Sequence, residues 1–557
     1  YMLVFNGEIF NFIEVRSELE QKGYTFVSDS DSEVLLASYI EWGSKCLEKF
    51  NGMWAFAIWD REKKELFMSR DRFGVKPLFY TCLSETDQAY AFASEMKALT
   101  PLMTQVTANR ELVMNPQHIV SYESTEQCVI NGIKRFPAGS YAYINQNGMT
   151  ITKWWDTLDH IPQVPKRYEE QVEMFRELFL DACKLRMRSD VTIGTALSGG
   201  LDSSATICAM AHLSKNDKDV RMNHDWQHAF VATFPGTTMD ESLYARKVTD
   251  FLGIQSTFVE IDPGKAIDQL NSYLYLFEDV YLTSPIPMMM LYHSLREHGT
   301  LVTIDGHGAD ELFGGYTFDF IHALKDAGLN KKDIDMILTA YLDSFPNDGS
   351  NMALASRSKL RTYLNYVRRD LVKHTVRRDK LYKSSAAGRI EYQKFDTLNK
   401  ILYTSSHETI LPTLLRNYDR YSMASGVEIR MPFMDYRIVS MAFALDWRSK
   451  LHGGYSKAII RDAMAPFMPK EIAYRKTKIG FNTPIVEWMQ GPLKAYFEDM
   501  INSSSFSNCD LIKPEPVREQ VKQVLYNEHA TFAMGEAAWC SIYPYLWEQA
   551  VLKAQSI

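Results

Sequence analysis

The sequence predicts an α+β fold followed by an α/β fold, in which a parallel sheet is succeeded by a mostly helical end. Up to about residue 155, short β-rich runs alternate with turns, and helical spacing of apolar residues is rare. From Tyr168 onward, strands alternate with long helices, the pattern of a parallel sheet with covering helices. Beyond Lys332 the sequence is predicted to be mostly helical.

The length and composition agree with more than one globular domain. A chain of 557 residues exceeds what one hydrophobic core usually serves. Its 46% hydrophobic and 23% charged residues are ordinary for folded proteins. Prolines interrupt residues 161–166, which form the expected linker. We therefore expect one domain at residues 1–160 and another at residues 167–557.

The charge and the cysteines exclude several classes of protein. A net charge of −8 argues against a nucleic-acid partner, which needs a clustered basic surface. The basic stretch at residues 366–383 is an exception, and we expect a solvated helix face there rather than a site for an anionic partner. The 7 cysteines contain no C-x-x-C pair, so reduced thiols in a cytoplasm fit best. No apolar run approaches the roughly 18 residues of a membrane-spanning helix.

In the first domain, helices are expected at residues 13–22 and 31–42. Strands are expected at residues 1–5, 54–59, 65–69, 78–82, 89–93 and 140–144. The first strand should lead into a polar turn at Asn6. Because Tyr1 is not an initiator methionine and a folded domain rarely opens on an interior strand, we expect further residues upstream in the natural protein.

In the second domain, strands and helices are expected to alternate. Strands are predicted at residues 191–196, 229–234 and 301–305, and helices at residues 169–188, from 202 onward and at 240–252. The first and third of these strands end in glycine-bearing turns. Such turns at the strand ends of a parallel sheet are candidate ligand sites.

The segment 198–203, with the sequence SGGLDS, is the sharpest functional signal. Its glycines let the backbone approach a phosphate, and the helix that follows offers unpaired N–H groups. Ser198 and Ser203 add hydroxyl donors, whereas Asp202 would repel a phosphate unless it held a magnesium ion. A glycine-rich turn alone is usually only a turn, but a strand, this segment and a helix together predict a nucleotide site. The chain has no Walker motif.

This segment resembles the loop of the PP-loop ATP pyrophosphatases, which cleave ATP to AMP and pyrophosphate. Residues 304–316, IDGHGADELFGGY, resemble the signature of the asparagine synthetase family. Residues 430–435, RMPFMD, and 476–481, KTKIGF, resemble two further motifs of that family. The resemblance extends from Val4 to about Trp488 and implies a PP-loop domain that adenylates a carboxylate.

The resemblance also implies roles for single residues. Asp202 and Asp310 would hold magnesium, and Lys478 takes the place of the catalytic lysine, which stabilises the charge that builds at phosphorus. Without its motif, Lys478 would be interpreted as a surface charge. The residues implied to bind ATP and pyrophosphate are Leu197, Ser198, Gly199, Gly200, Asp202, Ser203, Ala232, Asp305 and Gly306.

The start of the chain, NGEIFN at residues 6–11, resembles the glutaminase domain of the same family, an Ntn-hydrolase-type αββα sandwich that is truncated here at its start. By this resemblance Asn6 and Gly7 donate to the oxyanion of the reaction. Glu8 and Asp31, together with Asn6 and Gly7, would bind glutamine. The other family-like stretches of this half are better explained by a purely structural role, in which they only shape the domain.

The nucleophile of that family, an N-terminal cysteine, is absent from the sequence. None of the 7 cysteines is terminal, so none can replace it by the same mechanism. Either upstream residues supply the cysteine, which we favour, or the glutaminase half has become a scaffold.

His307 marks a departure from the family. Where asparagine synthetases usually have S-G-E-G, this chain has DGHG at residues 305–308. His307 is therefore a candidate catalytic base that takes a proton from ammonium. The same change equally fits a pocket for an acid other than aspartate.

The prediction is thus an enzyme that uses ATP and Mg²⁺ to amidate a carboxylic acid, by default aspartate, with ammonia from glutamine. One alternative is the same chemistry on a sugar acid or natural-product acid, or lactam closure. Another is a non-catalytic relative that acts as a binding or regulatory subunit. The expected partners are small molecules, without nucleic acid or membrane, and a homodimer is a candidate assembly.

Overall fold

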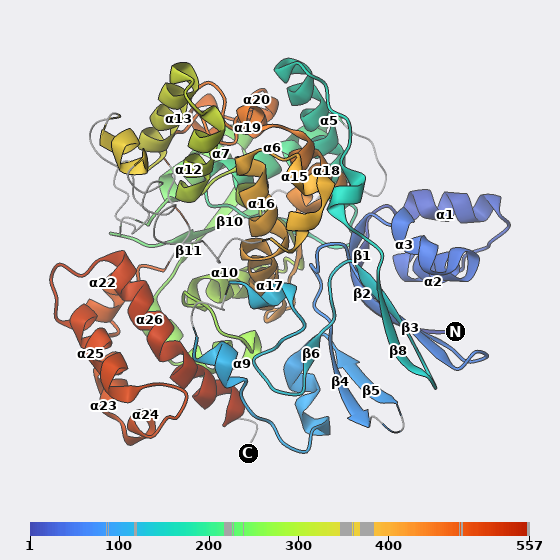
Figure 1. Ribbon diagram of the computed structural model, residues 1–557, viewed down its shortest axis with the longest axis horizontal. Helices are drawn as coiled ribbons and strands as arrows, with labels where there is room; N and C mark the ends of the chain where they lie inside the picture. The colour runs from blue at the N-terminus through green and yellow to red at the C-terminus, as the bar shows by residue number, and fades with distance from the viewer. Residues whose placement is uncertain are drawn as a thin grey trace.

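The computed structural model describes residues 1–84, 86, 88–115, 120–216, 226, 228–237, 239–345, 359, 361–367, 384–477, 480 and 483–553. Figure 1 shows a β-rich part at the N-terminal end beside a larger part in which helices surround a parallel sheet. Within the described chain, no helix has both the length and the apolarity needed to cross a membrane.

A five-stranded antiparallel sheet forms the centre of the first part. Its order is β1 (Met2–Ile9), β2 (Gly52–Asp60), β3 (Glu65–Arg70), β7 (Ser140–Asn145) and β8 (Gly148–Lys153). Helices α1 (Phe12–Gln21), α2 (Asp31–Trp42) and α3 (Cys46–Lys49) cover one face. Trp54, Phe56 and Phe67 are buried beneath them, so this face contributes a separate core.

A smaller antiparallel sheet packs on the opposite face. It consists of β5 (Ala89–Ala93), β4 (Phe79–Ser84) and β6 (Lys134–Arg135). Ala55, Met68 and Tyr80 form the core between the two sheets. The layer order of helices, sheet and sheet confirms the α+β prediction.

Strand β1 corrects one expectation. The polar turn predicted at Asn6 does not form, because residues 6–9 continue the strand. Asn6 pairs with Ala55 and Gly7 with Trp54 of β2, so their backbone groups join the antiparallel ladder. Pairing across the sheet therefore overrides the local preference of Asn and Gly for a turn.

The second part is built on a five-stranded parallel sheet, as predicted. Its order is β11 (Gln255–Glu260), β10 (His228–Thr233), β9 (Ile193–Ala196), β12 (Val302–Ile304) and β13 (Glu428–Arg430). Strands β11 and β13 were not predicted from the sequence. The chain order reverses between β9 and β12, and ligands of open α/β sheets bind at such a switch point.

Helices cover the sheet and fill the rest of the chain, as expected beyond Lys332. They are α4 (Arg110–Val113), α5 (Tyr168–Arg186), α6 (Leu201–Asn216), α7 (Ser242–Leu252), α8 (Pro263–Ile267), α9 (Leu270–Phe277), α10 (Ile286–Glu297), α11 (Ala309–Phe313), α12 (Thr317–Ala327), α13 (Lys331–Ser344), α15 (Ile390–Gln393), α16 (Thr397–His407), α17 (Ile410–Met423), α18 (Tyr436–Ala444), α19 (Trp447–Lys450), α20 (Ala458–Met464), α21 (Lys470–Ala473), α22 (Ile485–Gln490), α23 (Lys494–Asn502), α24 (Ser504–Ser507), α25 (Pro514–Leu525) and α26 (Phe532–Trp547). Residues 368–383, most of the predicted basic stretch, lie outside the described residues.

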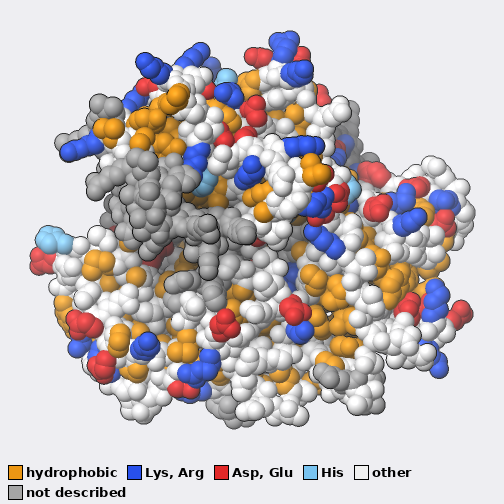
Figure 2. All heavy atoms as spheres, in the orientation of Figure 1, with side chains coloured by type: hydrophobic (Ala, Val, Ile, Leu, Met, Phe, Trp, Pro, Cys, Tyr) orange, Lys and Arg blue, Asp and Glu red, His pale blue; other side chains and the backbone are white. Residues whose placement is uncertain are grey.

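The two parts share hydrophobic cores. Phe79 and Val129 of the first part belong to the same buried cluster as Trp539 and Tyr543 of α26. Buried polar contacts cross the junction as well, including one from Asn51 Nδ2 to Asp435 Oδ2 at 2.8 Å. On the face shown in Figure 2, acidic and basic side chains are interspersed over the described surface.

Candidate functional site

The loop after β9 closes tightly onto the start of α6. The Oγ atoms of Ser198 and Ser203 lie 3.0 Å apart, and the Gly200 N–H donates to Ser198 Oγ at 3.2 Å. Gly199 has φ +74°, and a Cβ there would lie 2.4 Å from the backbone nitrogen of Ala245. Only glycine therefore fits, and the loop presents its hydroxyls and N–H groups at the carboxyl edge of the sheet.

The loop after β12 packs directly against it. A Cβ on Gly306 would lie 2.5 Å from the carbonyl carbon of Asp202. The chain then turns into α11, whose first turn contains Asp310. Gly315 follows that helix, and a Cβ there would lie 1.6 Å from Asp310 Oδ1. The glycines of the second motif thus allow the two loops to meet.

Asp202 and Asp310 face each other across one buried lysine. Lys457 Nζ lies 2.5 Å from Asp202 Oδ2 and 2.5 Å from Asp310 Oδ1. Burial opposes the ammonium, but the two carboxylates raise the pKa of Lys457 above its ordinary value. The two predicted metal ligands are therefore brought together at the switch point of the sheet.

Lys457 was missed by sequence reasoning. It precedes α20 with φ 51°, in the left-handed region that non-glycine residues rarely adopt. Such a conformation costs about 1 kcal/mol and clusters at functional sites. No local pattern distinguishes Lys457 from a surface lysine, so only its backbone conformation and its burial reveal it.

The donor set of this site fits magnesium. Mg²⁺ binds oxygen ligands and usually takes one or two carboxylates together with phosphate oxygens and water. Asp202 and Asp310 supply that pair. The described residues contain no group of three or more His, Cys, Asp and Glu side chains arranged for a metal, so nucleotide and water would complete the coordination.

Both carboxylate oxygens of Asp305 accept hydrogen bonds within the second part. Its Oδ1 accepts from the Ala196 N–H at 2.9 Å, and its Oδ2 accepts from the Tyr292 hydroxyl at 2.8 Å and the Thr303 hydroxyl at 3.2 Å. Burial raises the pKa of Asp305 to about 6. These bonds tie β9 to β12, which favours a structural role over the predicted contact with ATP.

His307 stacks on Tyr418 of α17, with ring centroids 3.5 Å apart and an angle of 18° between the planes. Its Nε2 lies 3.8 Å from Asp305 Oδ2 and has no hydrogen-bond partner among the described residues. Burial lowers the pKa of His307 to about 3, so the ring is neutral at pH 7. An imidazole with that pKa is a poor proton acceptor, which works against the predicted base and favours hydrogen bonding to a ligand.

Glu311 adds a carboxyl group to which the sequence assigned no role. It is buried in α11 and accepts a hydrogen bond from the Tyr316 hydroxyl. Burial, with the neighbouring charge of Asp310 as a further cause, raises the pKa of Glu311 to about 7. The loop after β12 therefore carries a second titratable group beside Asp310.

The remaining predicted residues lie around these loops or outside the described chain. The Leu197 N–H donates to the carbonyl of Phe230 at 2.8 Å, and Ala232 lies further along β10. Arg475, to which no role was assigned from the sequence, also lies here, with its guanidinium 3.6 Å from the ring centre of Tyr244, and it donates to Gly199 O at 3.4 Å. Lys478 lies outside the described residues.

The predicted glutamine site lies on β1. Asn6 Nδ2 donates to Ser94 Oγ at 3.0 Å. Gly7 has φ +149°, and a Cβ there would lie 2.1 Å from the carbonyl oxygen of Met53. The close approach of β2 therefore requires glycine beside the predicted oxyanion donor.

Glu8 and Asp31 are brought together next to the parallel-sheet part. Asp31 Oδ2 accepts from the Ile9 N–H at 3.0 Å, while Glu8 Oε2 lies 3.4 Å from Arg430 Nη2 of β13. Burial, opposed by Arg430 and assisted by Asp31, raises the pKa of Glu8 to about 8. Burial also raises the pKa of Asp31. A carboxylate pair of this kind can receive the ammonium group of an amino acid.

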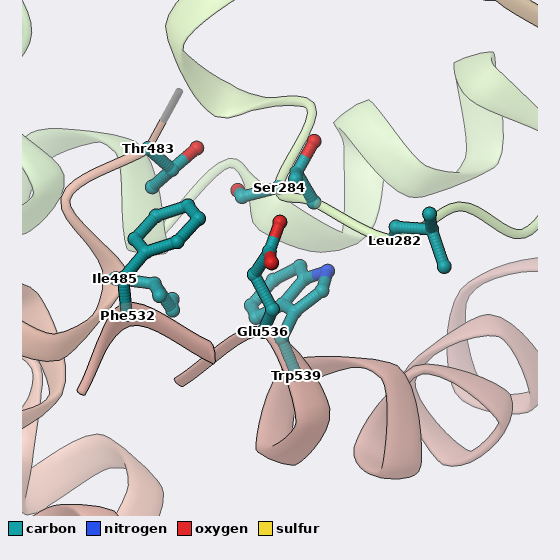
Figure 3. A pocket seen from close by; sticks show the side chains of 8 residues that line it. Leu282, Ser284, Thr483, Ile485, Phe532, Glu536 and Trp539 are labelled. Carbon is teal, nitrogen blue, oxygen red and sulfur yellow. The ribbon is translucent and has the colours of Figure 1, made fainter. Parts of the chain in front are cut away.

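A separate pocket lies between α26 and the loop before α10 (Figure 3). It encloses about 180 Å³, including space open to solvent. Its lining residues are Leu282, Thr283, Ser284, Thr483, Ile485, Phe532, Glu536 and Trp539. Burial raises the pKa of Glu536, whose carboxyl group points toward the Ser284 side of the pocket. Among the described residues, none of the predicted site residues lines it.

Comparison with known proteins finds a family match for each of the two parts of the chain. Residues 174–540 match the family model described as asparagine synthase, and residues 1–155 match a glutamine amidotransferase domain. The chain is 29% identical to asparagine synthetase [glutamine-hydrolyzing] 1 of Bacillus subtilis (strain 168), over 90% of this chain and 79% of that protein. It is 26% identical to asparagine synthetase [glutamine-hydrolyzing] 3 of the same organism, over 96% and 83%. Amidase chry2 of Gibberella zeae is 24% identical, over 91% and 81%.

Proposed function

Because this chain belongs to the asparagine synthase family, we propose that it is a carbon–nitrogen ligase that joins ammonia from glutamine to a carboxylate activated by ATP. The arrangement of Asp202 and Asp310 around Lys457, at the switch point of the parallel sheet, carries this proposal. Aspartate is the default acceptor, in keeping with the names of the two Bacillus relatives.

In the first step an oxygen of the acceptor carboxylate attacks the α-phosphorus of ATP, and pyrophosphate leaves. Asp202 and Asp310 would hold Mg²⁺, which neutralises phosphate charge when bound. Lys457, released from the carboxylate pair, is then free to contact the phosphates. Ser198, Ser203 and the N–H groups at the start of α6 bind the pyrophosphate, and Lys478 stabilises the charge at phosphorus.

In the second step ammonia attacks the acyl carbon, the bond from that carbon to the AMP oxygen breaks, and the proton lost by the nitrogen leaves with the AMP phosphate. His307 stays neutral and offers Nε2 to the acceptor or to ammonia, rather than taking the proton. In the other half, Asn6 and Gly7 donate to the oxyanion formed from glutamine, and Glu8 with Asp31 binds its α-ammonium group. A cytoplasmic location and a homodimer stay predictions from the sequence.

The test is a substrate assay with ammonium in place of glutamine, so that it reports the second part alone. We expect pyrophosphate and AMP to form only when ATP, Mg²⁺ and an acceptor acid are all present. Asp202→Asn should lower the rate at least about 100-fold, since it removes a charge that acts on the transferring phosphorus. Asp250→Asn, an exposed carboxylate on α7, is the matched control. ADP as the product, or full activity of Asp202→Asn, would refute the proposal.

A second acceptor class is favoured by one observation. His307, stacked on Tyr418, stands where the family usually has a glutamate, and it changes the charge and shape next to Asp305. The same adenylation would then act on a different acid. Pyrophosphate release can be measured with aspartate and with a panel of other amino acids, sugar acids and amino-bearing acids. If the acceptor is a different acid, release should depend on a member of that panel and not on aspartate.

A further inference from the structure

Helix α17 contacts both halves of the proposed active site. It runs from Ile410 to Met423, packs against α10, α16 and β13, and reaches the junction with the first part at Tyr122–Ser124. Tyr418 stacks on His307 at the adenylation site. Two residues later, the Arg420 side chain reaches the first part and donates to Ser94 O at 2.9 Å.

Ser94 connects this contact to the predicted oxyanion donor. Its Oγ accepts from Asn6 Nδ2 at 3.0 Å, while its carbonyl accepts from Arg420. An amide NH₂ group has two hydrogens in one plane. When one hydrogen is bound to Ser94, the direction of the other is fixed, so the position of Ser94 determines where Asn6 points its remaining donor.

Arg420 is itself held firmly. Its side chain is buried, Nη1 lies 3.3 Å from Glu278 Oε1, and the guanidinium packs 5.6 Å from the ring centre of Phe79. Glu278 also accepts from the Lys97 N–H at 2.8 Å. Displacing the guanidinium would leave Glu278 without one of its buried cations, which is energetically costly.

Asp419, between Tyr418 and Arg420, anchors the same turn of α17. Its Oδ1 lies 3.2 Å from Lys76 Nζ, and both side chains are buried. Three consecutive residues of α17 therefore contact His307, Lys76 and Ser94. A shift of this turn would move residues at both the adenylation site and the glutamine site, because buried ion pairs and close-packed rings resist independent movement.

We propose that Arg420 is a positioning residue for glutamine hydrolysis, which acts through Ser94 to orient the Asn6 amide toward the oxyanion. This inference rests on the proposed function. Arg420 touches no reacting atom. Its role is to hold a donor in the place where negative charge develops, the kind of preorganisation that makes oxyanion donors effective.

The first experiment compares glutamine-dependent with ammonia-dependent amide formation in the full-length protein. Ser94→Ala removes the acceptor of the Asn6 amide and should lower the glutamine-dependent kcat at least about tenfold, since loss of a whole oxyanion donor costs about 100-fold or more. The KM for glutamine and the ammonia-dependent rate should stay unchanged. Ser94→Thr keeps the hydroxyl and should retain most of the activity.

The second experiment tests the link to α17. Arg420→Lys should reproduce the selective loss of glutamine-dependent activity. The matched control is Arg416→Lys, because Arg416 is equally buried one turn earlier and binds Glu123 across the same junction, together with Asp279 of its own part. Arg416→Lys should lower stability but leave the ratio of the two activities unchanged.

A double-mutant comparison decides whether Arg420 acts through Ser94. In the Ser94→Ala protein, Arg420→Lys should cause little further loss, since residues in one chain of contacts are not additive. Equal effects in both backgrounds would overturn the inference, as would an unchanged activity ratio in Ser94→Ala. A wild type that makes amide from ammonium but not from glutamine would overturn both this inference and the proposed source of ammonia.

Discussion

At the scale of single residues, the site depends on charges that are buried in opposing pairs. Lys457 lies between Asp202 and Asp310, and Glu8 lies between Asp31 and Arg430. The two carboxylates raise the pKa of Lys457, while Arg430 and Asp31 act in opposite directions on the pKa of Glu8, because water is largely excluded. A bound cation can therefore take the place of a protein cation, as we propose for magnesium at the position of Lys457.

Lys457→Met should destabilise the protein by about 3 kcal/mol in the absence of magnesium, because two partly buried carboxylates then lose their shared buried cation. Adding Mg²⁺ should recover part of this loss, since the metal can occupy the same place. Urea unfolding with and without Mg²⁺ measures both effects. Lys247→Met removes a surface partner of Glu471 and serves as the control, with little change expected.

Glutamine binding should improve as the pH rises through about 8, where Glu8 ionises. Because the pKa of Glu8 is raised above its ordinary 4.5, the folded protein favours the protonated form, so this group lowers stability as the pH rises from 4.5 to 8. Glu8→Gln should remove that pH dependence and also weaken glutamine binding. The KM for glutamine and the urea midpoint of unfolding should be measured from pH 6 to 9. If neither quantity changed with pH in the wild type, the prediction would be contradicted.

At the scale of elements, the two glycine-bearing loops meet because Gly306 has no side chain where it touches the backbone of the other loop. Gly306 touches the backbone of Asp202, and Gly199 touches that of Ala245. The parallel order of β9 and β12 places both loops at the same edge of the sheet. Loop composition and strand order are thus both needed to bring the carboxylates together.

Gly306→Ala should separate the loops and cost about 2 kcal/mol of stability, in the range typical of overpacking. Turnover of ATP should fall more than stability explains, because Asp202 is displaced from Asp310. Gly388→Ala is a suitable control, since a Cβ there meets nothing within 4 Å. Thermal unfolding together with pyrophosphate release separates the two effects, and equal behaviour of the two variants would contradict the explanation.

At the scale of the whole molecule, polar contacts join the two parts into one structure. Asp435 lies at the start of α18. Its Oδ2 accepts a hydrogen bond from Asn51 Nδ2 of the first part at 2.8 Å and lies 3.1 Å from Arg186 Nη1 of α5. Burial alone would raise its pKa, but Arg437 and Arg186 hold the pKa of Asp435 well below its ordinary range. Its contribution to stability is therefore complete above about pH 4 and is lost as the pH falls below that.

Asp435→Asn should destabilise both parts together, by about 3 kcal/mol at neutral pH, because Arg186 and Arg437 lose their buried partner. Hydrogen exchange should increase in β2 as well as in α18. Asp510→Asn is the control, because its pairing with Arg110 also crosses between the parts but is exposed. Faster exchange in α18 alone would show that the two parts unfold independently.

The sequence by itself determined the fold class, the helix Asp31–Trp42 to its exact ends, and the two glycine-bearing loops at the ends of β9 and β12. These depend on local signals: Ser30 caps the helix by accepting from the Ser32 N–H, and the loops carry their glycines in sequence. The strands β11 and β13 were missed, since β13 has only 3 residues among helices and gains its identity from pairing with β12.

Only the tertiary structure decided which charges meet. Lys457 is 255 residues from Asp202, and Arg420 is 326 residues from Ser94. The residues next to a lysine or arginine in a polar stretch of sequence do not indicate whether it will be buried. Its role arises when packing removes water and leaves a distant carboxylate, carbonyl or ring as its partner, so the loops could be predicted but the cations that complete them could not.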